Sequence, residues 1–151
     1  MEVVFADGKD YDYLVANDHH VTPEMIRRKL EQNEIIVIRD DKQILGWLRY
    51  GYLCDVIPYM NMLYIEEKYR RTGLGTRLVE FWENEMKKSG YDKVMTSSDS
   101  PEQGQHFYRK LGYRDCGALL LPDEPLEIIF LKSLNQNDRQ SFMQNQRSVH
   151  G

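Results

Sequence analysis

The apolar and polar positions fall into short stretches, each with the period of a strand or of a helix. Near the N-terminus, Glu2–Ala6 alternates like a strand, and residues 10–17 follow as a short helix. Thr22, Pro23 and Glu24 then supply a capping hydroxyl, a proline at the first helical position and an acid in the first turn. This combination predicts the start of a second helix.

Three strands in succession are predicted next, at residues 35–38, 43–53 and 59–65. The first is a run of β-branched residues, and Gly46 predicts a bulge in the second. The period then changes, because the apolar residues from Leu74 onwards recur at helical spacing. This helix is expected to end at Ser89-Gly90.

The remaining pattern predicts a strand at 93–96, a helix at 101–111 closed by Gly112, and two strands at 113–121 and 126–134. The element order is therefore β-α-α-β-β-β-α-β-α-β-β. This order predicts an α/β fold with a mixed, mostly antiparallel sheet and flanking helices.

A length of 151 residues, 41% apolar, predicts one globular domain. We place this domain at residues 1–134. Residues 135–151 differ, because seven of the nineteen residues from Ser133 onwards are Asn or Gln. They are expected to form a polar, mobile tail, or a short helix that docks on a neighbour.

Composition excludes several classes of protein. No run approaches eighteen apolar residues and the N-terminus lacks a basic segment before a long apolar core, so no membrane helix or signal peptide is expected. Cys54 and Cys116 show no CxxC spacing, which favours a reduced, cytoplasmic setting. No acid or cysteine stands at ligand spacing from His19, His20 or His106, so no metal is expected. A net charge of −4 does not attract nucleic acid or an anionic membrane.

A glycine-rich turn lies between the third predicted strand and the long helix, with the sequence Arg70-Arg71-Thr72-Gly73-Leu74-Gly75-Thr76. The first turn of a helix has free N–H groups and a dipole that favours negative charge. The glycines allow a phosphate to approach the backbone, and Lys68 and Arg77 add positive charge. The turn therefore predicts a diphosphate-binding cradle.

Three other interpretations of this turn are open to the same residues. It can be a plain tight turn with solvated arginines. A P-loop requires Lys and Ser/Thr after the second glycine, but Gly75 is followed by Thr76-Arg77. A dinucleotide fold requires a third glycine where Leu78 stands, and it requires repeated βαβ units, which the three successive strands before the turn do not supply. One feature does agree with it, because Asp92 lies about where the ribose-binding acid of that fold would be.

The turn resembles the acyl-coenzyme A signature of the GNAT family of N-acetyltransferases, Arg/Gln-x-x-Gly-x-Gly/Ala, with Arg70, Gly73 and Gly75 in the fixed places. The preceding strand, Leu63-Tyr64-Ile65-Glu66-Glu67, is similar to the family's Leu-Tyr-Val-x-Pro, with Glu67 in place of the proline. Together with the element order, the resemblance covers residues 1–134.

The resemblance implies transfer of an acetyl group from acetyl-coenzyme A, as co-substrate, to a primary amine by direct attack in a ternary complex. The backbone of Leu63 or Tyr64 would donate to the carbonyl oxygen, and the pantetheine arm would pair near Ile65. The pyrophosphate would lie on the amides of the turn. The implied coenzyme A-binding residues in the turn are Arg70, Arg71, Thr72, Gly73, Leu74, Gly75 and Thr76.

The segment Phe107-Tyr108-Arg109-Lys110-Leu111-Gly112-Tyr113 is similar to the family's Phe-Tyr-x-x-x-Gly-Phe/Tyr. This implies that Tyr108 is the general acid for the leaving thiolate; a packing role is the alternative. Pro101 and Gly104 stand where the family helix often has asparagine and alanine.

The candidates for a general base are Asp55, Glu66, Glu67 and Asp99, and a water route stays open. Glu66 and Glu67 are expected to face solvent.

Around Tyr50, one face of the strand is expected to be core and the other either the wall of an acceptor cleft or ordinary packing. The acceptor is a small-molecule or peptide amine, and its identity is left open. A non-catalytic acyl-coenzyme A sensor and an interaction module remain alternatives, and a homodimer is compatible with the sequence.

Overall fold

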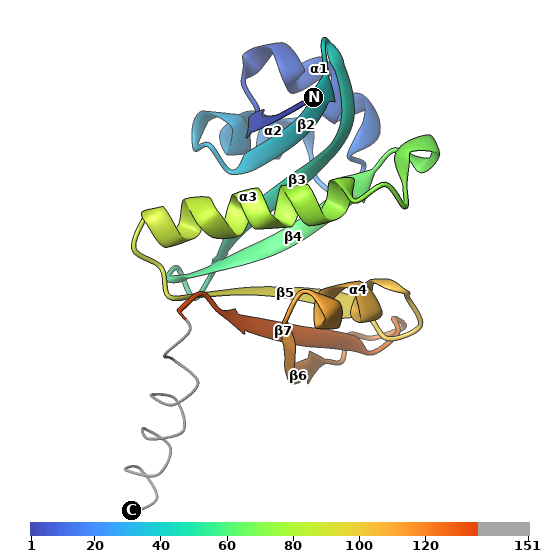
Figure 1. The fold of residues 1–151 in the computed structure, drawn as a ribbon. Coiled ribbons are helices and arrows are strands. Elements are labelled where there is room, and N and C mark those ends of the chain that lie inside the picture. The colour runs from blue at the N-terminus through green and yellow to red at the C-terminus, as the bar shows by residue number, and fades with distance from the viewer. Residues whose placement is uncertain (136–151) are drawn as a thin grey trace, which may run out of the picture. The chain divides into compact units, whose positions relative to one another are not determined.

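The predicted order of strands and helices is confirmed in the computed structural model, which describes residues 1–135 (Figure 1). The strands are β1 (Glu2–Phe5), β2 (Ile35–Asp40), β3 (Gln43–Leu53), β4 (Ile57–Ile65), β5 (Lys93–Asp99), β6 (Arg114–Leu119) and β7 (Glu127–Ser133). The α-helices are α1 (Tyr11–Asn17), α2 (Pro23–Glu31), α3 (Leu74–Lys88) and α4 (Gly104–Lys110). Short 3₁₀ turns η1 (Gly8–Asp10) and η2 (Glu67–Tyr69) precede α1 and follow β4. The expected polar tail lies outside the described residues except for Asn135, so its boundary stays a prediction.

Local signals explain where two of the helices begin. The Met25 N–H donates to Thr22 Oγ1 at 3.2 Å, so Thr22 is the N-cap that the sequence predicts. Helix α4 begins at Gly104, three residues later than expected. The reason is a turn after β5, in which the Glu102 N–H donates to the Asp99 carbonyl at 2.9 Å. This turn holds Pro101 outside the helix.

The chain forms two compact units. The first contains Met1–Gly51 and Met60–Trp82, with strands in the order β1-β2-β3-β4. The second contains Tyr52–Tyr59 and the described residues from Glu83 onwards, with strands in the order β5-β7-β6. The β1–β2, β2–β3, β5–β7 and β7–β6 pairs are all antiparallel.

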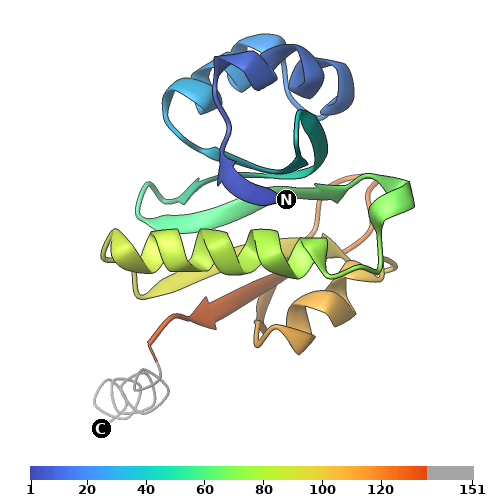
Figure 2. The same cartoon turned by 45° about the horizontal axis from the view of Figure 1, so that its top comes forward.

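The sheet of the first unit is covered on both faces. Ile35 and Val37 of β2 join a buried cluster with Leu14 of α1 and Ile26 of α2. On the other face, the Phe5 ring lies 5.7 Å from that of Phe81 in α3. Figures 1 and 2 show α1 and α2 on one side of these strands and the first part of α3 on the other. This explains why the sequence of β2 is a continuous apolar run rather than an alternating one.

The second unit contains a buried polar cluster beside its aromatic core. The Tyr113 hydroxyl donates to Glu83 Oε2 at 2.7 Å, and Lys132 Nζ donates to Glu83 Oε1 at 2.8 Å. Both Tyr113 and Glu83 are buried. Burial raises the pKa of Tyr113, and the Glu83 carboxylate raises it further.

The bulge expected in β3 is present beside Gly46. Ile38 pairs with Gly46 but Arg39 pairs with Ile44, so Leu45 is the extra residue. A Cβ atom at Gly46 would lie 2.5 Å from the Tyr64 carbonyl oxygen. The close approach of the two backbones therefore requires glycine, and it sets the position of the last residues of β4.

Gly46→Ala is expected to destabilise the protein by about 1–3 kcal/mol, because the new methyl group meets backbone atoms that must move. The midpoint of urea denaturation measures the change. The control is Gly117→Ala in β6, where a Cβ meets nothing within 4 Å. It should change stability by less than about 0.5 kcal/mol. Equal midpoints for the two variants would show that β4 does not depend on this contact.

The raised pKa of Tyr113 predicts a loss of stability in alkaline solution. The tyrosine ionises near pH 10 in the unfolded chain but at higher pH in the folded one, so stability falls as the pH rises above about 10. Tyr113→Phe should reduce the slope of the unfolding free energy against pH by up to about 1.4 kcal/mol per pH unit. Denaturant titrations between pH 9 and 11.5 measure the slope. An unchanged slope would contradict the assignment.

Candidate functional site

The glycine-rich turn places a row of backbone amides at the start of α3. The first helical hydrogen bond runs from the Arg77 N–H to the Gly73 carbonyl, at 3.1 Å. The amides of Gly73, Leu74, Gly75 and Thr76 therefore precede the helical ladder and have no partner within the helix. With the helix dipole, these four N–H groups favour an anion at this end of α3.

The space next to these amides, at the α-carbon of Gly73, is unoccupied by other protein atoms. Gly73 has a φ of +84°, and a Cβ there would meet nothing within 4 Å. Arg71 also has a positive φ, of 65°, and the Thr72 hydroxyl donates to the Tyr69 carbonyl. The turn thus combines free amides with the space that a diphosphate needs, so the residues present fit the pyrophosphate of acetyl-coenzyme A.

The arginines of the turn differ in their contacts. Arg70 Nε donates to the Ile65 carbonyl at 2.8 Å, and the guanidinium lies over the Tyr64 ring at 5.2 Å. Arg70 therefore ties the turn to β4. Within residues 1–135, Arg71 and Arg77 are exposed and form no ion pair. Their charge is available to a ligand.

The strand residues predicted to bind coenzyme A lie just before the turn. Leu63, Tyr64 and Ile65 are half-buried at the end of β4. The Tyr64 ring stacks on Trp47 with a centroid distance of 4.7 Å. Their backbone roles toward the acetyl and pantetheine groups stay predictions.

Tyr108 belongs to the second unit, whereas the turn belongs to the first. It is 8% exposed, and its ring contacts those of Phe107, Tyr113 and Phe130. Burial raises the pKa of Tyr108 to about 12, although a hydrogen bond with the Thr96 side chain acts in the opposite direction. The hydroxyl therefore stays protonated throughout the neutral range, as a proton donor must.

The candidate bases lie in different surroundings. Asp55 is exposed in a turn with a φ of 65°, Glu67 is exposed, and Asp99 is half-buried at the end of β5. The expectation that Glu66 faces solvent is wrong. Its carboxylate accepts a hydrogen bond from the Tyr13 hydroxyl and is half-buried.

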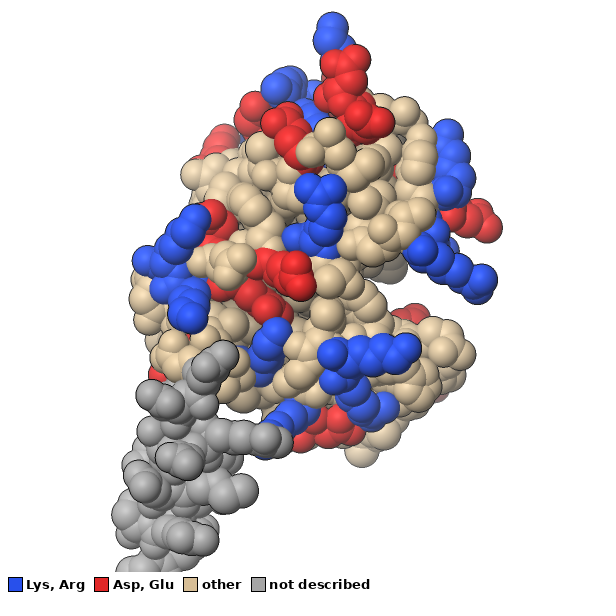
Figure 3. All heavy atoms as spheres, viewed as in Figure 1, with Lys and Arg blue, Asp and Glu red and all other residues tan. Residues whose placement is uncertain are grey.

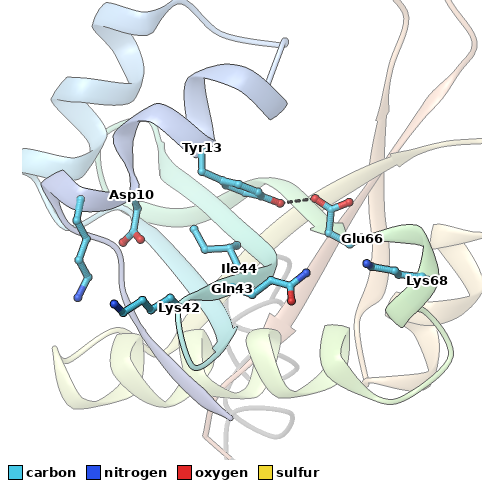
Figure 4. A pocket seen from close by; sticks show the side chains of 8 residues that line it. Asp10, Tyr13, Lys42, Gln43, Ile44, Glu66 and Lys68 are labelled. Carbon is cyan, nitrogen blue, oxygen red and sulfur yellow. Dashed lines mark hydrogen bonds between the residues drawn. The ribbon is translucent and has the colours of Figure 1, made fainter.

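A pocket of about 360 Å³ adjoins Glu66 in the first unit (Figure 4). Its two acids are engaged, because Asp10 accepts from the two terminal nitrogens of the Arg39 guanidinium, at 3.0 and 3.2 Å, and Glu66 accepts from the Tyr13 hydroxyl. The remaining lining residues are Lys9, Lys42, Gln43, Ile44 and Lys68. This pocket is not predicted from the sequence, because its residues come from three separate segments without a shared motif.

The idea that one face of β3 near Tyr50 walls an acceptor cleft is wrong. Trp47, Leu48, Arg49 and Tyr50 are each at most 5% exposed, so packing covers both faces there. Arg49 is buried because its Nε donates to Asp18 Oδ2 at 2.8 Å. The alternative expectation, ordinary sheet packing, is confirmed for these residues.

His19, His20 and His106 are all exposed. In residues 1–135, no three His, Cys, Asp or Glu side chains lie together in a way that could hold a metal ion. No helix in the same range is both long and apolar enough to span a membrane. Figure 3 shows acidic and basic side chains interspersed over the viewed face rather than gathered into one basic stripe.

A family model described as an acetyltransferase (GNAT) domain matches residues 31–115, more than half of the chain. A curated protein from Danio rerio, probable N-acetyltransferase 14, is 33% identical over 93 residues. The match covers 60% of this chain and 33% of the relative, so the chain spans about a third of that protein's length.

Solved structures of acetyltransferases share the fold. Ard1 from Thermoplasma volcanium matches with a TM-score of 0.77 at 13% identity, covering 89% of this chain and 98% of the other. An aminoglycoside 6′-N-acetyltransferase complexed with coenzyme A matches with a TM-score of 0.72 at 18% identity, covering 89% and 98%. The predicted fold class is therefore confirmed, as is the resemblance on which it was based.

Proposed function

Because the chain belongs to the acetyltransferase (GNAT) family, we propose that it transfers an acetyl group from acetyl-coenzyme A to the amine of a small molecule or peptide. One observation carries the proposal toward coenzyme A. Four amides that precede the helical ladder lie at the start of α3, beside a glycine whose α-carbon faces open space. This arrangement suits a diphosphate, such as the one in acetyl-coenzyme A.

In the proposed complex, the pyrophosphate accepts hydrogen bonds from the amides of residues 71–76. Arg71 and Arg77 supply positive charge at the same place. The pantetheine arm runs along the end of β4 near Ile65. The N–H of Leu63 or Tyr64 donates to the thioester oxygen, where negative charge grows in the transition state.

The reaction follows from direct attack. The neutral amine forms an N–C bond to the carbonyl carbon, the C–S bond breaks, and coenzyme A leaves as a thiolate. The amine loses one proton to a base or to water, and the thiolate gains one. Tyr108 supplies that proton in our proposal, because its hydroxyl keeps its proton up to a pKa of about 12. The base stays unassigned among Asp55, Glu66, Glu67, Asp99 and water.

A panel of amines tests the proposed function. With acetyl-coenzyme A present, a true acceptor should release free thiol at a rate that saturates in both substrates. Gly73→Glu should abolish coenzyme A binding in calorimetry, because a side chain and a negative charge would both occupy the phosphate position.

The matched control is Gly90→Glu, at the other end of α3. Gly90 also has a positive φ, of 96°, and open space where a Cβ would stand. Both variants therefore introduce similar backbone strain, but only Gly73→Glu should lose its binding of coenzyme A. Unchanged affinity of Gly73→Glu would remove the cofactor from this turn. Binding by the wild-type protein without thiol release on any amine would favour a sensor.

Tyr108→Phe tests the proposed acid. The change keeps the ring among Phe107, Tyr113 and Phe130 and removes only the hydroxyl. Turnover should fall by roughly 10²–10⁴-fold while affinity for coenzyme A changes little. Steady-state kinetics on an acceptor from the amine panel measures both.

The control is Tyr91→Phe, a half-buried tyrosine whose ring packs on Tyr52 in the same unit. It should keep normal turnover. Since the pKa of Tyr108 lies near 12, any alkaline limb of the rate below about pH 11 should persist in Tyr108→Phe. Near-normal turnover of Tyr108→Phe would make the residue structural, and loss of binding would make it a ligand contact.

A further inference from the structure

Helix α1 is joined to the end of β4 by one side-chain hydrogen bond. The Tyr13 hydroxyl donates to Glu66 Oε1, across 53 residues of sequence. Figure 4 shows the phenol reaching from α1 to the carboxylate beside the pocket. The Glu66 N–H also donates to the Leu45 carbonyl at 2.8 Å. Glu66, the first residue after β4, is therefore held by α1 through its side chain and by β3 through its backbone.

A stack of rings makes a second connection between the same places. The Tyr13 ring meets Trp47 edge-on, with centroids 5.9 Å apart, and Trp47 stacks on Tyr64 at 4.7 Å. The Arg70 guanidinium lies over the far partner, Tyr64, at 5.2 Å. Contacts starting at Tyr13 thus reach Arg70, which opens the glycine-rich turn.

The segment from Glu66 to Thr72, which leads into the glycine-rich turn, buries few of its side chains. Residues 66–72 contain no proline, and most of them are exposed. Local hydrogen bonds link them, because the Tyr69 N–H donates to the Glu66 carbonyl at 2.9 Å and the Thr72 hydroxyl donates to the Tyr69 carbonyl. These hydrogen bonds connect Glu66 through Tyr69 to Thr72, the residue before Gly73, so the position of Glu66 influences that of the turn.

We propose that Tyr13 is a positioning residue for the acyl-coenzyme A site. By holding Glu66 directly and Tyr64 through the Trp47 ring, it fixes the glycine-rich turn in the geometry that presents the amides of residues 73–76. The inference rests on the proposed function, since it needs that turn to bind coenzyme A. A turn ordered before the ligand arrives loses less conformational entropy on binding, so its affinity is higher.

Tyr13→Phe tests this role, because it keeps the ring against Trp47 and removes only the hydroxyl. The Kd for coenzyme A, measured by calorimetry, should rise about threefold to tenfold, the worth of one hydrogen bond. The apparent KM for acetyl-coenzyme A should rise by the same factor. The kcat at saturation should fall by a smaller factor than the KM rises, because Tyr13 acts on binding rather than as a group of the chemical step.

Two further variants separate positioning from a general loss of structure. Glu66→Gln keeps an acceptor oxygen for the Tyr13 hydroxyl and should retain most of the affinity. Glu66→Ala should weaken binding as Tyr13→Phe does, and adding Tyr13→Phe to it should cause no further loss. Tyr11→Phe is the matched control, since Tyr11 is also half-buried on α1 but its ring lies under Arg27.

The outcomes distinguish this inference from the proposed function. If the wild-type protein does not bind coenzyme A, the proposed function fails first. If the wild-type protein binds and Tyr13→Phe binds equally well, Tyr13 has no positioning role. An equal loss in Tyr11→Phe, additive losses in the Tyr13 and Glu66 double variant, or a fall in kcat without a rise in KM would each overturn the inference as well.

Discussion

The close approach of β4 to β3 at Gly46 is the constraint on which the cofactor end of the first unit depends. The Tyr64 carbonyl lies where any side chain at position 46 would begin. The extra residue of the bulge, Leu45, accepts a hydrogen bond from the N–H of Glu66, the residue that directly follows β4. The exit from β4, and with it the start of the glycine-rich turn, is thus set by backbone contacts with a neighbouring strand rather than by the turn itself.

Buried ion pairs then fix helix α1 and the loop after it against the same sheet. Arg39 of β2 holds Asp10 at the start of α1, and Arg49 of β3 holds Asp18 at its end. Both pairs are almost fully buried, so the desolvation of the charges offsets much of their attraction. Their value lies in specificity, because an unpaired charge would be costly in any other register. Because α1 is held at both ends, the position of the Tyr13 side chain relative to the sheet is fixed.

Much of this arrangement is visible in the sequence, and the parts that are not have a common cause. The cap at Thr22, the bulge at Gly46 and the signature around Gly73 are local, so their residues alone predict them. Whether both faces of β3 are buried could not be decided from the sequence, because Arg49 has the polarity of a solvent-facing residue and its partner Asp18 is 31 residues away. The Tyr13–Glu66 contact could not be predicted for the same reason, because the two residues are 53 positions apart. Pairings of this kind depend on the tertiary fold, and one sequence gives no signal of them.

Burial has two opposite effects on the transfer of a proton from Tyr108 to a leaving thiolate. It weakens the phenol as an acid, because a pKa near 12 lies above that of a cysteine-type thiol in water, about 8.5, so the transfer to a solvated thiolate is unfavourable. The same low-polarity surroundings raise the proton affinity of any thiolate that forms in them, which narrows the difference. Proton transfer from Tyr108 is therefore efficient only if the sulfur is also desolvated when the C–S bond breaks. A buried donor of this kind would act on the leaving group in a closed complex and not on coenzyme A in solution.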